Sequence, residues 1–279
     1  MITDAQMHLW ELDRPDRPWP KPQRGEPQRE GGWSGEEAIA AMDAIGVDRT
    51  VIVPAVVAGD KNEYAKEVVA KYPDRFRIMG RIDIADPEAS ARLLPTWKSQ
   101  QGMLGVRLSL GVDKQLEERS LEWLWAGCEE HGIPIMMLPQ GGPILDRVAE
   151  VAEQHPGRTI ILDHLALRLV QDGTAWNTLD ATLALARFPK VNVKVSSVPN
   201  FSTEPYPYRD VHPHIRRVYD AYGPRRMFWG SDFTRLRGTY MDCLRLFRDE
   251  MDFLSAEDRE WILGRGIAEC IGWPETTAR

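Results

Sequence analysis

The sequence contains few cysteines and no long apolar run. Only three cysteines occur among 279 residues, and none of them forms a Cys-x-x-Cys pair. The cysteines are odd in number and far apart, so the thiols are expected to be reduced. No stretch approaches the roughly 20 apolar residues that span a bilayer, which excludes an integral helical membrane protein. A basic segment followed by an apolar run is also missing at the start, so we expect no signal peptide and a cytoplasmic protein.

Basic clusters and low-complexity tracts are missing too. Lysine and arginine are scattered through a chain of net charge −7. Nucleic acid is therefore not expected as a partner, because phosphate binding needs a basic patch. The apolar content of 43% is enough for a large core. The length suits one α/β barrel, and we predict a single domain over residues 1–279.

Short β-rich runs alternate with helical patterns along the chain. The expected strands are 2–8, 49–55, 76–84, 104–110, 133–138, 159–164, 191–197 and 227–232. Several are near-continuous apolar stretches, as strands buried on both faces are. The expected helices are 34–47, 61–72, 120–132, 143–157, 176–188, 239–251 and 255–273. Eight strands alternating with helices predict a (β/α)8 TIM barrel, with a doubly wound open sheet as the alternative.

Two connections are unusually long. Residues 11–33 are rich in proline, glycine and charge, and residues 199–213 are rich in proline and aromatic side chains. In a barrel both loops follow strands one and seven at the rim that carries the active site. Their aromatic residues could form a lid over the pocket, or the loops could simply cover the surface.

Polar residues gather at the expected strand ends, where barrel enzymes place their chemistry. In chain order they are Asp4, Gln6, His8, Arg107, Asp163, His164, Lys194 and Asp232. Any one of them alone is more often structural. Polar groups at several strand ends are harder to explain by packing, because charges are rarely buried unpaired.

The remaining histidines lie at expected helix ends. His131 and His155 are placed at C-termini, where a cationic ring suits the helix dipole. His212 and His214 fall at a loop-to-helix junction beside a proline. We interpret all four as structural.

A resemblance to a known family becomes specific at these positions. The segments DAQMHLW, GVRL, ILDHLA, VKVSS and GPRRMFWGSDF have the order and spacing of the amidohydrolase superfamily. The chain most resembles its amidohydrolase-related branch, which includes 2-pyrone-4,6-dicarboxylate lactonase and sugar lactonases, over nearly its whole length. This resemblance implies a (β/α)8 barrel, in agreement with the alternating elements.

The resemblance also assigns roles to single residues. It matches His8 to the second histidine of a strand-one His-x-His motif, His164 to the strand-six histidine, and Asp232 to the catalytic aspartate. Gln6 stands where the first histidine is usual. The end of the fifth strand, IPIMMLPQ, offers methionine and leucine where a further ligand is expected.

These departures bear on the metal. A catalytic zinc takes three protein ligands and a water, and glutamine is a poor ligand. His8, His164 and Asp232 could still form a bare ligand set, which is the alternative of a metal-dependent amidohydrolase or decarboxylase with zinc as cofactor. The resembling branch includes enzymes thought to work without metal. We therefore expect no obligatory cofactor.

A metal-free site must lower the barrier with hydrogen-bond donors and fixed charge. We predict Asp232 as the general base for water, with His8, His164 and the Gln6 amide as donors to a carbonyl oxygen. An ordinary Asp titrates near ~3.9 and is a weak base, which suits an activated lactone better than an amide.

The substrate is expected to be small and anionic. Arg107 and Lys194 are predicted to bind its carboxylate, with ion pairs inside the barrel as the alternative for both. Trp10 is expected to contact a flat or apolar part of it. The predicted function is hydrolysis of a lactone or similarly activated ester by a monomer or homodimer. A barrel that binds a small acid without catalysis is the alternative from another class.

Overall fold

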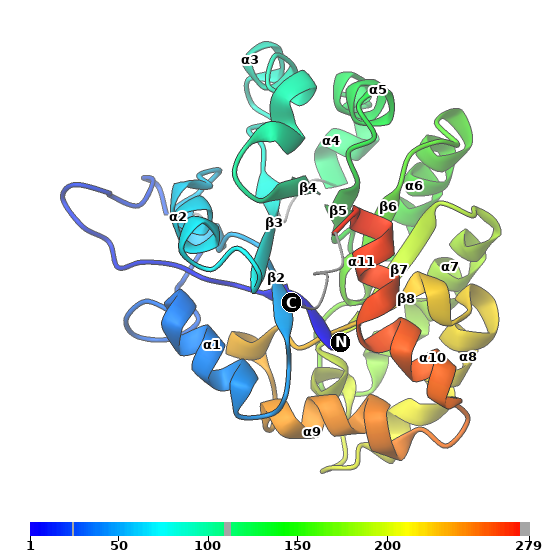
Figure 1. The fold of residues 1–279 in the computed structure, drawn as a ribbon. Helices are drawn as coiled ribbons and strands as arrows, with labels where there is room; N and C mark the ends of the chain where they lie inside the picture. Colours follow the sequence, from blue (N-terminus) through cyan, green and yellow to red (C-terminus); the bar gives the residue numbers. More distant parts are fainter. Residues whose placement is uncertain (24, 109–112, 274–279) are drawn as a thin grey trace.

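The eight predicted strands pair in parallel in the order of the chain, which confirms the predicted TIM barrel (Figure 1). The computed structural model describes residues 1–23, 25–108 and 113–273. The strands are β1 (Thr3–Met7), β2 (Arg49–Ile52), β3 (Phe76–Arg81), β4 (Met103–Arg107), β5 (Ile135–Met137), β6 (Ile160–Leu162), β7 (Val191–Ser196) and β8 (Met227–Gly230). Directly after β8, the backbone N–H of Asp232 donates to the carbonyl of Gln6 at 3.0 Å and brings the last strand back to the first.

Helices surround the strands (Figure 1). They are α1 (Gly35–Asp43), α2 (Glu63–Lys71), α3 (Pro87–Ala91), α4 (Asp113–Glu117), α5 (Glu122–Glu130), α6 (Gly142–Gln154), α7 (Leu179–Ala184), α8 (His212–Tyr222), α9 (Tyr240–Arg245), α10 (Ala256–Glu260) and α11 (Gly266–Ile271). No helix in the described part of the chain is both long and apolar enough to cross a membrane. His131 and His155 follow α5 and α6 as C-caps, as predicted.

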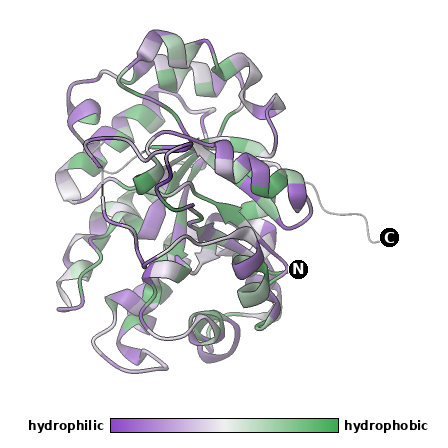
Figure 2. Ribbon diagram, turned by 90° about the vertical axis from the view of Figure 1, so that its left-hand side faces the viewer, coloured by the Kyte–Doolittle hydropathy of each residue, from purple (hydrophilic) through white to green (hydrophobic). Residues whose placement is uncertain are grey.

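The core has two layers. One fills the barrel interior with side chains such as Ala5, Val51, Met136 and Phe228, and α11 packs against it. The larger layer lies between the strands and the surrounding helices. Figure 2 shows the corresponding distribution, with hydrophobic strands inside and hydrophilic residues on the outer helix surfaces. Successive residues of a strand point to opposite sides, so each strand serves both layers.

Local sequence explains where elements start and stop. Ser34 caps α1 in a capping box with Glu37, which satisfies backbone donors at the helix start. The predicted helix 255–273 is divided into α10 and α11 by a wider turn that contains Gly264. A Cβ on Gly264 would lie 2.4 Å from the carbonyl oxygen of Met1, so this position needs glycine.

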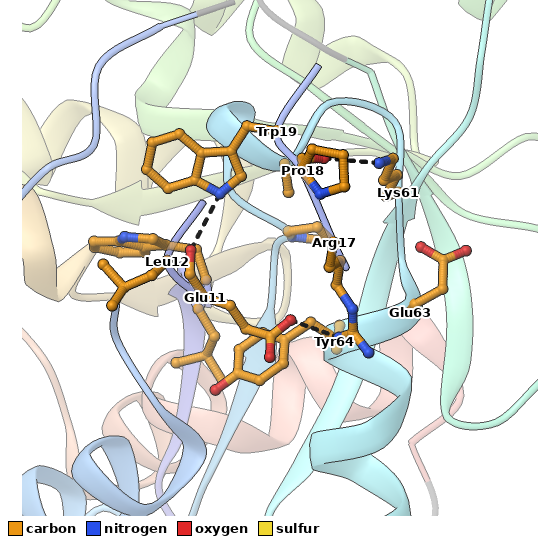
Figure 3. Close-up of a pocket in the computed structure, with 13 residues that line it drawn as sticks. Glu11, Leu12, Arg17, Pro18, Trp19, Lys61, Glu63 and Tyr64 are labelled. Carbon is orange, nitrogen blue, oxygen red and sulfur yellow. Dashed lines mark hydrogen bonds and ion pairs between the residues drawn. The ribbon is translucent and has the colours of Figure 1, made fainter. Parts of the chain in front are cut away.

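The loop of residues 11–33 is folded back on itself and onto α2. Arg17 pairs with Glu11 at 2.5 Å and with Glu67 of α2 at 2.6 Å. Trp19 donates its indole N–H to the carbonyl of Glu11 at 3.2 Å. Figure 3 shows Arg17 and Trp19 beside a small side pocket at this loop. One loop residue, Arg24, lies outside the described residues, as do Ser109 and Leu110 at the end of the predicted fourth strand.

Candidate active site

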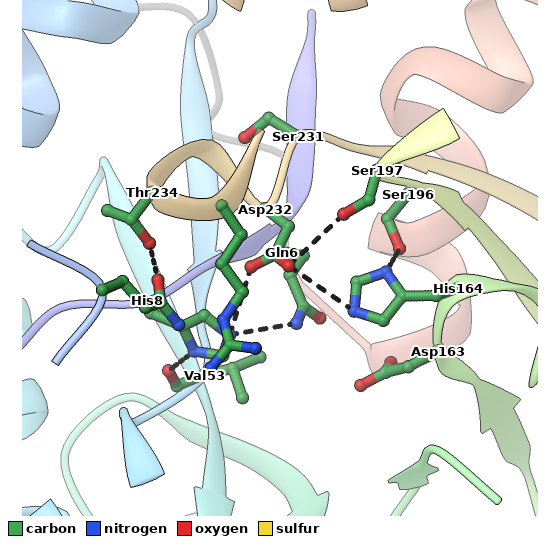
Figure 4. A network of polar contacts seen from close by, with 12 residues as sticks. Gln6, His8, Val53, Asp163, His164, Ser196, Ser197, Ser231, Asp232 and Thr234 are labelled. Atoms are coloured by element: carbon green, nitrogen blue, oxygen red, sulfur yellow. Dashed lines mark hydrogen bonds and ion pairs between the residues drawn. The ribbon is translucent and has the colours of Figure 1, made fainter. Parts of the chain in front are cut away.

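Asp232 lies at the centre of a polar cluster just beyond the end of β8. Its side chain is 1% exposed. The Oδ1 atom lies 3.2 Å from Nε2 of His8, and the Oδ2 atom lies 3.7 Å from Nε2 of His164 (Figure 4). The hydroxyl of Ser197 also donates to Oδ2 at 3.3 Å. The structure therefore brings together the three predicted catalytic residues, Asp232, His8 and His164.

The His8 ring is oriented by a backbone carbonyl. Its Nδ1 lies 2.8 Å from the carbonyl oxygen of Val53, next to the end of β2. A carbonyl only accepts, so Nδ1 donates its proton to Val53. Nε2 lies 3.2 Å from the carboxylate of Asp232, which also only accepts, so a proton on Nε2 makes the hydrogen bond to Asp232. The amide nitrogen of Gln6 lies 3.3 Å from the same ring nitrogen.

His164 is oriented from the neighbouring strand. Its Nδ1 lies 2.8 Å from the hydroxyl of Ser196 on β7. When that hydroxyl donates to Nδ1, the proton of the neutral ring is on Nε2, the nitrogen that faces Asp232. His164, Ser197 and Asp232 all have positive φ angles, near 50°. This backbone conformation is uncommon for residues other than glycine, and it aims side chains from three strand ends at one point.

Asp4 holds the segment that carries Asp232. Its buried carboxylate accepts hydrogen bonds from the backbone N–H and the hydroxyl of Ser231, and from the hydroxyl of Tyr240 at 2.8 Å. The backbone N–H of Gln6 donates to the same carboxylate at 3.0 Å. Burial raises the pKa of Asp4, and these donors oppose the shift. Asp4 thus joins β1 to Ser231, the residue before Asp232.

A buried ion triad lies in the barrel interior beside this cluster. Asp163 is 0% exposed, and its two oxygens pair with Nε of Arg107 and Nζ of Lys194, each at 2.6 Å. Burial alone raises the pKa of Asp163, but the charges of Arg107 and Lys194 outweigh it and hold that pKa below the usual value. Arg107 and Lys194 thus form ion pairs inside the barrel, which the sequence analysis gave as the alternative to binding of a substrate carboxylate.

Two further pKa shifts determine the charge of the site. Burial raises the pKa of Asp232, but the hydrogen bond from His8 and the charge of that ring outweigh it, so the pKa lies below its ordinary value. Burial lowers the pKa of His164, although the charges of Asp232 and Asp163 oppose that shift. At neutral pH the site therefore presents an ionised Asp232 beside a neutral His164 ring.

These residues form the floor of a cavity of about 260 Å³. That volume is close to the lower end of small-molecule sites, which occupy roughly 300–1,000 Å³. The lining residues are Gln6, His8, Gln28, Val56, Arg81, Arg107, Leu138, Gln140, His164, Arg168, Leu169, Val170, Asp232 and Arg235. Four of them are arginines and one is a carboxylate, so the cavity is positively charged although the whole chain is acidic.

The sequence did not reveal several lining residues, above all Arg81, Arg168 and Arg235. Arg168 and Arg235 are exposed, and the structure pairs neither of them with a carboxylate among the residues it describes. They follow His164 and Asp232 by four and three residues, and tight turns after those positions bring them to the cavity. Their short spacing after His164 and Asp232, which were predicted to be catalytic, was the signal available in the sequence.

Two predicted binding residues lie away from the lining. Lys194 is buried behind the floor, where its ammonium contacts Asp163. Trp10 is buried and donates its indole N–H to the carbonyl of Gly31 at 3.0 Å. It borders the side pocket of Figure 3, whose volume of about 40 Å³ is too small for an organic acid. The structure therefore does not bring either residue to the cavity.

The two long loops differ in their relation to the cavity. Gln28 of the loop 11–33 lines it and accepts a hydrogen bond from the hydroxyl of Thr234. In the loop 199–213, the hydroxyl of Tyr206 instead donates to Glu250 at 2.7 Å. Of the described residues, none from 199–213 lines the cavity. Only the first loop is placed to act as a cover.

The donor set does not fit a catalytic zinc. Within residues 1–23, 25–108 and 113–273, no group of three histidine, cysteine, aspartate or glutamate side chains is arranged to hold a metal ion. The carbonyl oxygen of Gln6, its one potential ligand atom, is bound by the ammonium of Lys194. A catalytic zinc requires three such ligands, and a nearby buried ammonium opposes a second cation.

The chain belongs to the amidohydrolase family, whose model matches residues 3–268. It is 27% identical over 250 residues to an L-fucono-1,5-lactonase of Burkholderia ambifaria. This alignment covers 86% of this chain and 83% of that protein. It is 25% identical over 237 residues to a 4-sulfomuconolactone hydrolase of Hydrogenophaga intermedia, with coverage of 80% and 74%. The chain is accordingly an enzyme of the hydrolase type found in this family.

Solved structures show the same fold. A probable 2-pyrone-4,6-dicarboxylic acid hydrolase of Acinetobacter baumannii, solved with citric acid bound, superposes with a TM-score of 0.78 at 17% identity. The match covers 98% of this chain and 99% of that one. An amidohydrolase of Burkholderia multivorans, solved with zinc bound, superposes with a TM-score of 0.80 at 21% identity. This match covers 98% of this chain and 100% of that one. The barrel is therefore shared with proteins that were solved with different ligands bound.

The ion triad makes a testable prediction about stability. Replacing Asp163 with Asn leaves the buried charges of Arg107 and Lys194 without their carboxylate. Breaking a buried pair in this way costs about 3–5 kcal/mol in the free energy of unfolding. Urea denaturation of the wild type and Asp163→Asn measures this difference.

A surface pair provides the matched control. Glu88→Gln breaks the exposed contact of Glu88 with Arg92, which spans 2.6 Å. Exposed pairs contribute about 0–1 kcal/mol. Equal losses for Asp163→Asn and Glu88→Gln would contradict a structural role for the triad.

Proposed function

We propose that this enzyme hydrolyses the lactone of a small anionic organic acid, with Asp232 as general base and without an obligatory metal. The observation that carries this proposal is the arrangement of Asp232 between His8 and His164 at the floor of the arginine-lined cavity. This site contains a base for water and donors for a carbonyl oxygen, the two elements that ester hydrolysis requires.

The first step adds water to the lactone carbonyl. Asp232 orients the water and accepts one of its protons as the water oxygen bonds to the carbonyl carbon. Negative charge then develops on the carbonyl oxygen. The Nε2–H of neutral His164 and the amide N–H of Gln6 are the donors that stabilise this oxyanion.

The second step breaks the ring. The carbon–oxygen bond of the ring cleaves as the tetrahedral intermediate collapses to a carboxylic acid, which releases its proton to solvent, and the leaving oxygen needs a proton. His8, whose Nε2 lies 3.2 Å from Asp232, gives its Nε2 proton to the leaving oxygen and then takes up the proton that Asp232 accepted from water. This assigns His8 to proton transfer and leaves oxyanion binding to His164 and Gln6.

The low pKa of Asp232 supports a lactone as the substrate. A carboxylate that stays ionised far below neutral pH is a weak base, so it suits an electrophile with a good leaving group. An amide has a much poorer leaving group. The names of the two relatives, a sugar lactonase and a muconolactone hydrolase, agree with this choice.

The arginines support an anionic substrate. Arg107 lines the cavity, pairs with Asp163 through Nε, and has no protein partner for Nη1 among the described residues. Arg168 and Arg235 add two charges nearer the solvent. Guanidinium groups bind carboxylates in a bidentate manner, so a substrate carboxylate has several partners here.

A panel of lactones tests the proposal. It contains neutral sugar lactones, carboxylated sugar lactones and carboxylated unsaturated lactones, together with matched amides. We expect turnover of lactones, preference for those with a carboxylate, and no turnover of amides. Preferential cleavage of the amides would contradict it.

The role of Asp232 is tested by Asp232→Asn. The amide keeps the size of the side chain but cannot accept the proton from water, so kcat should fall ~10²–10⁴-fold. The control variant Asp220→Asn changes an exposed aspartate on α8 and should keep wild-type kcat. Near-normal kcat in Asp232→Asn would remove this residue from the mechanism.

The role of the outer arginines is tested by Arg168→Gln and Arg235→Gln. Each should lower kcat/KM for a carboxylated lactone about tenfold, equivalent to about 1.4 kcal/mol. The loss should shrink at high salt because exposed charges are screened. Arg92→Gln, on an exposed arginine that pairs with Glu88, is the control. A loss of the same size for a neutral lactone would show that these arginines do not recognise charge.

A further inference from the structure

Lys194 is the one predicted binding residue with a fully buried charge and no access to the cavity. It lies on β7 and is 0% exposed. Its ammonium contacts Oδ1 of Asp163 at 2.6 Å, the sulfur of Met136 at 3.0 Å and the carbonyl oxygen of Ala5 at 3.3 Å. A fourth contact is the side-chain oxygen of Gln6. The ammonium thus reaches β1, β5 and the residue after β6.

The contact with Gln6 determines which way its amide points. A lysine ammonium can only donate, so it must face the oxygen of the amide and never its nitrogen. The NH2 group of Gln6 is thereby directed to the other side. There it lies 3.3 Å from Nε2 of His8, and Gln6 lines the cavity.

The opposite orientation would change the chemistry of the site. It would direct the Gln6 oxygen toward the developing oxyanion, which needs a donor. Asp163 stabilises the observed orientation of the Gln6 amide, because its carboxylate holds the Lys194 ammonium in place through a second short contact.

We propose that Lys194 is a positioning residue that acts on the reaction through Gln6. It orients the amide so that an N–H faces the substrate carbonyl, and it supplies fixed positive charge where the family more often has a histidine at the Gln6 position. This inference rests on the proposed function, because the N–H acts on the carbonyl oxygen of a lactone. This positioning role takes the place of the direct substrate binding that the sequence analysis predicted for Lys194.

A double-mutant cycle tests the coupling. Gln6→Leu removes the donor and should lower kcat ~10²–10³-fold, the usual effect of losing one oxyanion donor. Lys194→Met should lower kcat by a similar factor while KM changes little, since the substrate does not touch the ammonium. The double variant should be no worse than Gln6→Leu alone. Independent, multiplying losses would overturn the proposal.

Gln6→Glu keeps the experiment decisive if Lys194→Met folds poorly. A carboxylate retains and strengthens the contact with the Lys194 ammonium, so the variant should fold, but it has no N–H for the substrate. We expect a wild-type circular dichroism spectrum and the same loss of kcat as in Gln6→Leu. A Gln6→Glu enzyme with near-normal kcat would overturn the proposal.

A spectroscopic readout separates this inference from the proposed function. In protein labelled with ¹⁵N at glutamine side chains, the Gln6 NH2 signals are identified by their loss in Gln6→Leu. The two protons should be well separated and slow to exchange in the wild type, and fast to exchange in Lys194→Met. Unchanged signals would refute the positioning role even if lactones are hydrolysed. Changed signals in a protein that hydrolyses no lactone would refute only the proposed function.

Discussion

The carboxylate of Asp163 is the interaction on which the rest of the site depends. It neutralises two cations, Arg107 and Lys194, in the interior of the barrel. Without it, neither charge is tolerated there, because burying an unpaired ion is costly. With it, Arg107 lines the cavity, and Lys194 is held against Gln6. In the proposed mechanism, one buried aspartate therefore supports both the recognition of the substrate and the orientation of a catalytic donor.

The site separates its charges in a way that suits hydrolysis of an activated ester. The carboxylate of Asp232 is kept ionised by its hydrogen bond with His8, while His164 is kept neutral by burial. Arginines at the rim add positive charge that attracts an anion toward the floor. The remaining polar groups, Asp4 and Ser197 among them, hold the turns in position. The energetic cost of turning residues such as Asp232 to positive φ is met by this network.

Much of this could be predicted from the sequence, for identifiable reasons. Short β-rich runs, several of them near-continuous apolar stretches, predicted all eight strands, and the motif GSDF with DHLA led to Asp232 and His164. Lys194 was expected at the substrate, but side chains alternate along a strand and its position points into the barrel interior. Arg168 and Arg235 were not found, because they act from turns whose conformation a strand pattern does not define. Trp10 was expected at the cavity, and the fold of its own loop buries it elsewhere.

The central claim is that Asp232 activates water with hydrogen-bond donors and fixed charge in place of a metal. The most direct test measures metal content by plasma mass spectrometry and kcat for a carboxylated lactone on the same enzyme sample, before and after exhaustive chelation. The account predicts full kcat at a metal content far below one ion per subunit. A kcat that falls in proportion to the metal removed, and returns when zinc is added, would contradict it.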